Sequence, residues 1–99
     1  ARNPRARIVC SVEGRISNST PPGQSAFTSM TSTMKAIVSE RHAAPFNDAK
    51  VHYVELPRAD GSGRDGAPDL TGCGGHANAS YHRRAATDVA AKVKTIMSW

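Results

Sequence analysis

Two short apolar segments, with a long helical segment between them, constrain most strongly what this chain can fold into. The first, Ala6–Val12, gathers β-branched residues around Ile8 and Val9, as buried strands of parallel sheets do. The second, Lys50–Leu56, alternates in polarity and ends at Pro57, which also predicts a strand. Because a helical segment lies between them, we expect the two strands to be parallel members of one sheet.

Two further segments have the periodicity of amphipathic helices. The first spans Ala26–Arg41, with Ser25 as its expected N-cap. Its apolar residues recur every three or four positions: Phe27, Met30, Met34, Ile37 and Val38. The second spans Tyr81–Ser98, with Asn78 or Ser80 as its cap. Its predicted apolar stripe is Ala86, Val89, Ala90, Val93, Ile96 and Met97, and its predicted outward residues are Arg83, Arg84, Asp88, Lys92 and Lys94.

The order strand, helix, strand, helix is typical of the end of an α/β domain with a parallel sheet. Two strands are too few for such a sheet, so we expect about three more from another chain or from a segment before residue 1. Aromatic residues make up only 5% of the chain, and a core this thin favours a chain that depends on a partner. We therefore interpret residues 1–99 as the C-terminal part of a single domain.

A glycine-rich loop follows the second predicted strand. The segment Arg58–Gly75 holds six of the eight glycines, and its length favours a functional loop. Ligands of parallel sheets bind beyond the carboxyl ends of the strands, and His76 comes directly after this loop. A histidine there can act as general base for a serine hydroxyl, or it can simply stabilise the turn.

The remaining histidines have ordinary interpretations. His82 lies in the first turns of the second predicted helix, where a surface or packing role is expected, and His42 and His52 lie at a helix end and in a strand. A zinc site from Cys73, His76 and His82 would have suitable ligand types. Neither a Cys-x-x-Cys nor a His-Glu-x-x-His motif accompanies them, so we predict no metal site.

The segment GCGGHANASYHRRAA, Gly72–Ala86, resembles the last conserved block of the SGNH (GDSL-type) hydrolases. It is most similar to the acetyl xylan esterases of carbohydrate-esterase family two, in which a Gly-Cys pair precedes the catalytic histidine and a second histidine follows six residues later. The upstream segments NPRARIVCSVEG and Met34–Leu56 resemble the preceding strand, helix and strand of that family, and Trp99 resembles its terminal aromatic residue. The resemblance implies a flavodoxin-like three-layer sandwich, of which this chain would be the C-terminal β-α-β-α part.

The same resemblance implies that His76 is the catalytic base of a carboxylic ester hydrolase. Most SGNH enzymes orient this histidine with an aspartate three residues earlier, a position that Cys73 occupies here. The family-two esterases also lack that aspartate and use a serine–histidine dyad. The implied substrate is an acetylated carbohydrate or a small ester, and no cofactor is implied. Ala77 stands where the family typically has proline.

The other half of such a site is missing from the sequence. It contains no Gly-Asp-Ser and no Gly-x-Asn-Asp segment, and Ser62 lacks the strand-to-helix context of a nucleophile. The resemblance therefore implies a partner, an N-terminal chain or fragment that carries the serine and the oxyanion-hole residues. We expect the isolated chain to be inactive. The alternative is a non-catalytic structural or interaction subunit derived from a hydrolase.

Charge and short motifs add further expectations. The 13 Lys+Arg and 8 Asp+Glu residues give a net charge of +5, but the basic residues are scattered, so we expect no nucleic-acid partner. No apolar run approaches the roughly 20 residues of a membrane span. Cys10 and Cys73, both expected near one sheet edge, permit a disulfide. Glycosylation sequons at Asn18 and Asn78 favour a secreted or extracellular location.

Overall fold

The computed structural model describes residues 3–19, 21–59, 73 and 76–99. Along the chain lie strand β1, helix α1, strand β2 and helix α2, which span Ile8–Cys10, Ala26–His42, Val51–Tyr53 and Ala79–Met97. The predicted order of two strands and two helices is therefore confirmed. Each strand has three residues, so both are shorter than the sequence pattern indicated.

β1 and β2 pair in parallel, as predicted. Ile8 lies opposite Val51, and Cys10 lies opposite Tyr53. The amide of Ile8 donates to the carbonyl of Lys50 at 2.9 Å, and the amide of Val54 donates to the carbonyl of Cys10 at 2.9 Å. Since the even-numbered residues of β2 and its flanks bond to β1, the odd-numbered residues direct their amides and carbonyls to the opposite edge.

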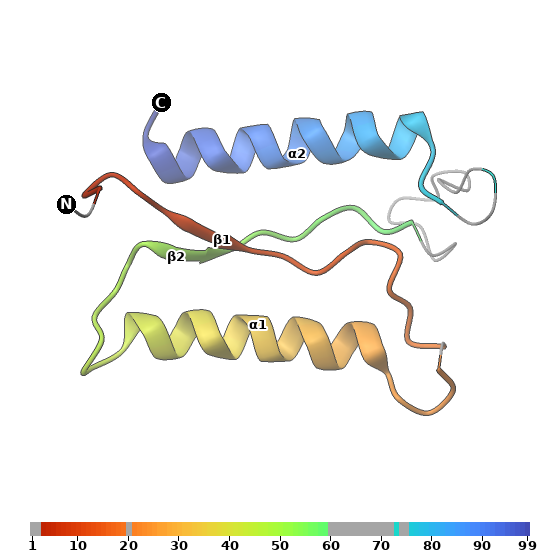
Figure 1. Cartoon of the computed structure of the whole chain (residues 1–99), viewed down its shortest axis with the longest axis horizontal. Coiled ribbons are helices and arrows are strands. Elements are labelled where there is room, and N and C mark those ends of the chain that lie inside the picture. Colours follow the sequence, from red (N-terminus) through yellow and green to blue (C-terminus); the bar gives the residue numbers. More distant parts are fainter. Residues whose placement is uncertain (1–2, 20, 60–72, 74–75) are drawn as a thin grey trace.

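The helices lie on opposite sides of this strand pair, so the described residues form a small α/β arrangement (Figure 1). Its core is small and is centred on β2 and the segments that leave the strands. The buried apolar residues are Val12, Val51, Val54, Ala59 and Tyr81. Neither described helix has the length and apolar character that crossing a membrane requires.

The covered face of α1 is narrower than predicted. Met30 and Ile37, which were expected on that face, are 41% and 42% exposed. At about 100° per residue, both lie on the flank of the helix opposite Lys35, which pairs with Glu55 past the outer edge of β2. Met30 and Ile37 therefore lie on the β1 side, where β1 is the last strand of the sheet. The half-buried residues of α1 include Phe27, Thr31, Met34 and Val38.

The covered face of α2 is rotated from the predicted apolar stripe and overlaps it only in part. Ala86 and Ala90, expected in the apolar stripe, are exposed, and Arg84, expected to point outward, is half-buried. The cause is the start of the helix, where burial of Tyr81 fixes the rotation. The covered residues are Tyr81, Arg84, Ala85, Val89, Val93, Ile96 and Met97. Four of the six predicted stripe positions are thus confirmed.

The N-terminus of α1 is capped by a residue from the preceding loop. Ser25 has a left-handed backbone and its side chain makes no capping bond, so the prediction of Ser25 as the capping side chain is wrong. Instead, Asn18 Oδ1 accepts from the amide of Thr28 at 2.9 Å, and Asn18 Nδ2 donates to Thr28 Oγ1 at 2.8 Å. One side chain therefore satisfies a free amide of the first turn and holds the loop on the helix.

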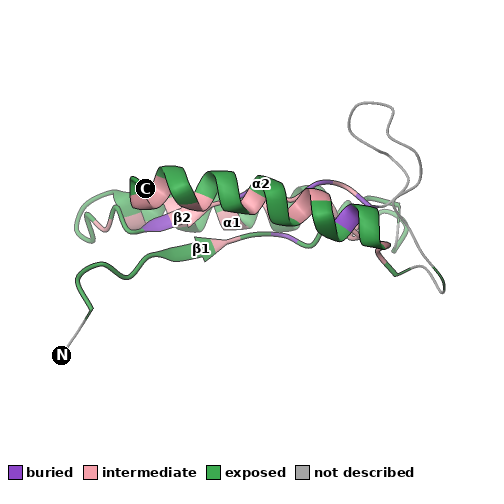
Figure 2. Ribbon diagram, turned by 90° about the horizontal axis from the view of Figure 1, so that it is seen from above, coloured by how far each residue is buried: buried purple, intermediate pink, exposed green. Residues whose placement is uncertain are grey.

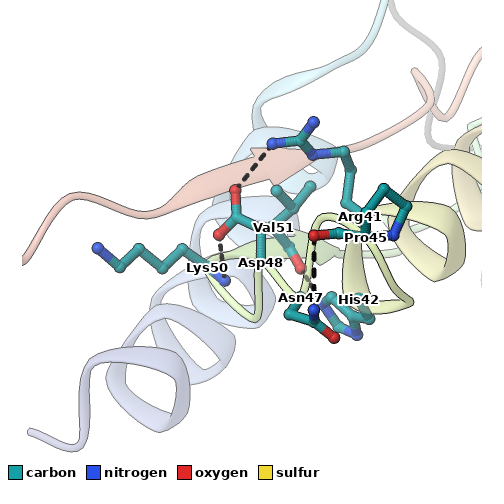
Figure 3. Close-up of polar contacts among 7 residues, drawn as sticks. All are labelled: Arg41, His42, Pro45, Asn47, Asp48, Lys50 and Val51. Atoms are coloured by element: carbon teal, nitrogen blue, oxygen red, sulfur yellow. Dashed lines mark hydrogen bonds and ion pairs between the residues drawn. The ribbon is translucent and has the colours of Figure 1, made fainter.

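Side chains at the end of α1 fix the turn into β2 (Figure 3). Asp48 accepts from Arg41 Nη2 at 3.2 Å and from the Lys50 amide at 3.1 Å. These bonds, first the Lys50 amide and then Arg41, lower the pKa of the Asp48 carboxyl below its usual value. His42 Nε2 lies 2.7 Å from the carbonyl of Val51 and donates to it, because a carbonyl only accepts. His42 thus occupies the outer edge of β2 at its first residue.

Candidate active site

The candidate site lies at the carboxyl ends of β1 and β2, where the loop after β1, the segment after β2 and the start of α2 meet (Figure 1). The two strands remain side by side past their ends, since the Ala59 amide donates to the Gly14 carbonyl at 2.8 Å. This parallel continuation brings the first turn of α2 against the loop after β1. The region that ligands use in parallel sheets is therefore built from all three segments.

Gly14 is the point of closest approach in this region. A Cβ added there would collide with the Pro57 carbonyl and would lie 2.5 Å from Tyr81 Oη. The Tyr81 ring is buried, with 6% of its surface exposed. Burial raises the pKa of the Tyr81 phenol, and a hydrogen bond from the Gly14 amide acts in the opposite direction with a smaller effect. Only a residue without a side chain lets α2 start at this position.

His76 lies exposed just ahead of α2, as its place in the sequence predicts. Its amide donates to the carbonyl of Cys73 at 3.2 Å. Two residues later, Asn78 Oδ1 accepts from the Tyr81 amide at 2.9 Å and caps the helix, which confirms Asn78 over Ser80. The His76 backbone is therefore fixed between a tight turn and a capped helix, while its imidazole makes no hydrogen bond to any described residue.

Cys73 supports this turn through its backbone. Its thiol is free and exposed, and the half-buried Cys10 thiol is also free, so the expected disulfide is not formed. Cys10 is the last residue of β1, whereas Gly14, four residues farther on, is the one that reaches α2. The start of α2 is therefore packed against the loop beyond Cys10.

The other histidines are distributed over both ends of the sheet. His82 is exposed, with its ring edge-on to Tyr81 at 5.7 Å between centroids. His42 and His52 lie together at the amino ends of the strands, with centroids 6.4 Å apart. Among the described residues, no three His, Cys, Asp or Glu side chains gather closely enough to hold a metal ion. Cys73, His76 and His82 therefore do not form a ligand set in this part of the chain.

Arg58 is a residue of this region that the sequence patterns did not single out. Its guanidinium stacks on the ring of Phe27 at 3.4 Å from the centroid, and Nη2 donates to the Ile16 carbonyl at 3.1 Å. Desolvation lowers the pKa of this guanidinium. Arg58 thereby joins the segment after β2 to both the loop after β1 and the start of α1, contacts that no local pattern indicates.

The two sequon asparagines both have structural roles. Asn18 uses both ends of its amide on Thr28, and Asn78 uses Oδ1 as the cap of α2. Glycosylation at either position stays a prediction. Ser62, which the sequence analysis rejected as a nucleophile, lies outside the described residues. The six glycines of the loop before His76 also lie outside them.

The comparisons with known proteins do not place the chain in a family. Against protein-family models, curated proteins and solved structures alike, the chain has no match.

Proposed function

We propose that this chain supplies the catalytic histidine, His76, of an SGNH-type serine ester hydrolase. In this proposal, the serine and the oxyanion-hole donors belong to an N-terminal chain or fragment, and the described α/β unit is the C-terminal part of the completed flavodoxin-like sandwich. The substrate class is a short acyl ester, with O-acetyl groups of carbohydrate as the leading candidate. The isolated chain lacks the nucleophile and is inactive.

The observation that carries the proposal is the placement of His76. The residue stands directly before the capped helix α2, which begins at the end of the unit where the carboxyl ends of the parallel strands lie (Figure 1), and its amide is held by the Cys73 carbonyl. This edge is where groups from neighbouring strands converge on a ligand. An exposed imidazole with no partner among the described residues is available to a serine that arrives from a strand added beside β1.

A second observation supports the need for that added strand. The large apolar residues on the β1 side are uncovered: Ile8 is 58% exposed, Val9 42%, Met30 41% and Ile37 42%. Figure 2 shows β1 exposed over most of its length. A strand laid beside β1 would cover Ile8 and Val9, and it would extend the sheet over the flank of α1 that bears Met30 and Ile37.

In the proposed reaction, His76 takes the proton of the serine hydroxyl as the serine attacks the ester carbonyl. The imidazolium then returns this proton to the leaving alcohol, and a water molecule is activated in the same way to release the acid. The absence of an aspartate at position 73 means that the ring has to be oriented by groups of the partner. Cys73 contributes only the carbonyl that holds the His76 amide.

The test is hydrolysis of p-nitrophenyl acetate by the native complex, with His76→Ala compared against the matched His82→Ala. We expect a loss of about 10³-fold or more for His76→Ala and less than a twofold change for His82→Ala, because His82 is exposed and its ring lies against Tyr81. Undiminished hydrolysis by the His76→Ala complex would contradict the proposal. Failure of a fluorophosphonate probe to label any chain of the complex would favour the non-catalytic subunit instead.

A further inference from the structure

A second surface, separate from the candidate active site and independent of the proposed function, lies along the outer edge of β2. A groove of about 510 Å³ runs there between the two helices. Its floor is the end of β2 and the two residues after it, Val54 and Glu55. Its lining includes Lys35 of α1, Tyr53 and Glu55 of the floor, and Asp88, Ala91 and Lys92 of α2. The volume falls within the range of ligand sites.

On the floor of the groove, no described residue pairs with the outward backbone groups of Tyr53. Residues 50, 52 and 54 face β1, as the bonds of the Lys50 carbonyl and the Val54 amide show. Val51 faces outward, because its carbonyl accepts from His42. Tyr53, two residues on, therefore also directs its amide and carbonyl outward, into the groove. These are the groups with which a strand edge binds an extended peptide.

The two walls of the groove differ in whether their charged side chains form ion pairs within the chain. On the α1 wall, Lys35 Nζ lies 4.0 Å from Glu55 Oε2 and 5.2 Å from the centroid of the Tyr53 ring. On the α2 wall, Asp88 and Lys92 make no ion pair with any described residue. The α2 wall thus presents one acidic and one basic group to a ligand, one helical turn apart.

The spacing of these two groups matches an extended chain. Asp88 and Lys92 are separated by about 6 Å along the helix, and alternate side chains of a strand are about 6.6 Å apart on one face. A peptide paired with Tyr53 would therefore place two alternate side chains next to Asp88 and Lys92. Charge complementarity requires one of them to be basic and the other acidic.

We propose that this groove binds an extended peptide segment of another protein, which adds to the outer edge of β2 and carries a basic and an acidic residue two positions apart. A symmetric dimer through this groove does not fit, because one hollow placed against the same hollow leaves a void. A simple anion does not fit either, since the lining residues named above include two basic and two acidic side chains.

The test uses blocked peptides with the full chain at low ionic strength, followed by titration calorimetry. The probes are acetyl-Val-Lys-Val-Glu-Val-amide and two like-charge versions, Val-Lys-Val-Lys-Val and Val-Glu-Val-Glu-Val. We expect the mixed-charge peptide to bind with 1:1 stoichiometry and at least fivefold more tightly than either like-charge peptide. Equal binding of all three peptides, or no binding of any, would overturn the proposal.

Charge reversal on the α2 wall provides the second arm. Lys92→Glu makes the wall wholly acidic, so the preference should switch to the Lys-Val-Lys peptide. The matched control is Lys94→Glu, which changes the net charge equally at an exposed position on the opposite side of α2 and should leave all affinities within twofold. A mixed-charge preference that persists in Lys92→Glu would contradict the assignment of Lys92.

Methylation of peptide amides tests the backbone part. N-methylation of the central Val removes one donor, and N-methylation of the adjacent Lys removes a donor that points the other way. Because alternate amides of a strand face opposite edges, we expect one of the two modifications to weaken binding at least fivefold and the other to have little effect. Equal effects of the two would exclude pairing with Tyr53.

Discussion

The two edges of the sheet are treated in opposite ways. Along β1 the edge is apolar and uncovered, with Ile8 58% and Val9 42% exposed. Along β2 the first outward carbonyl, that of Val51, is already bonded to His42. Beyond Tyr53, the Lys35–Glu55 pair lies over the same edge. The β1 edge therefore resembles the interior of a larger sheet, and the β2 edge resembles the protected edge of a complete one.

Edge strands in soluble proteins are protected from indiscriminate pairing by charges and by covering groups. β2 has both kinds of protection, and it leaves only a short segment around Tyr53 for a selective partner. β1 itself contains no charged residue, and no described strand lies on its outer edge. The uncovered flanks of both helices lie on its side, at Met30 and Ile37 of α1 and at Ala86 and Ala90 of α2. From this difference we infer that further strands of the sheet would be added at β1, while β2 is suited to bind a selected peptide at Tyr53.

The largest effect on stability is expected at Gly14, where the segments that follow both strands meet α2. Gly14→Ala would drive a Cβ into the Pro57 carbonyl and toward Tyr81 Oη, which would separate the segments after β1 and β2 and displace α2. We expect the free energy of unfolding to fall by about 3 kcal/mol, the upper range for overpacking. Urea denaturation followed by circular dichroism measures it.

Gly23→Ala is the matched control for Gly14→Ala. Gly23 has φ +77° and no atom within 4 Å of an added Cβ, so its substitution costs only the backbone strain of a left-handed residue, about 1 kcal/mol. If the two variants lose the same stability, close packing at Gly14 is not what joins the two strands to α2.

The next effect concerns the apolar edge alone. An uncovered β1 edge lets isolated copies of the chain associate, and Ile8→Lys would place a charge in that contact. We expect the dissociation constant for self-association, measured by sedimentation velocity, to rise about tenfold, since part of an isoleucine side chain would no longer be buried on association. Stability should change little, because Ile8 is already mostly exposed.

Lys92→Glu tests the other edge of the sheet, because Lys92 lines the groove beside β2 and lies away from β1. Ile8→Lys should change self-association and leave peptide binding intact, and Lys92→Glu should do the reverse. A chain that remains monomeric at high concentration before any substitution would show that the β1 edge is not a pairing surface.

The sequence predicted the elements of this fold because each has its own periodicity. The β-branched run at Ile8 and Val9 and the alternation through Tyr53 indicated strands, and three- and four-residue spacing indicated helices. The position of His76 ahead of α2 followed from the same reading, because a glycine-rich segment and a capping Asn78 stand on either side of it.

The errors arose where contacts between distant residues decide the outcome. Ser25 is next to α1, yet Asn18 caps it from the preceding loop. The apolar residues of α2 predicted a covered face that includes Ala86. Burial of Tyr81 beside Gly14 instead sets the rotation of the helix about its axis, which leaves Ala86 exposed. Helical periodicity states which residues share a face and gives no information on how wide the covering sheet is.

The smallest effect should come from removing His42 from the protected edge. His42→Ala would remove the bond of 2.7 Å to the Val51 carbonyl, and we expect a loss of about 1 kcal/mol in the free energy of unfolding, the usual net value of one hydrogen bond. His42→Gln, which keeps a side-chain donor, should recover part of this loss in stability. The control His82→Ala, at an exposed position, should stay within about 0.5 kcal/mol of the parent.

Without the His42 side chain, the Val51 carbonyl becomes available to a strand, so a longer mixed-charge peptide should bind His42→Ala more tightly than the parent chain. Weaker binding would mean that His42 supports the groove and does not limit it, and the contrast between an open and a protected edge would then rest on the Lys35–Glu55 pair alone.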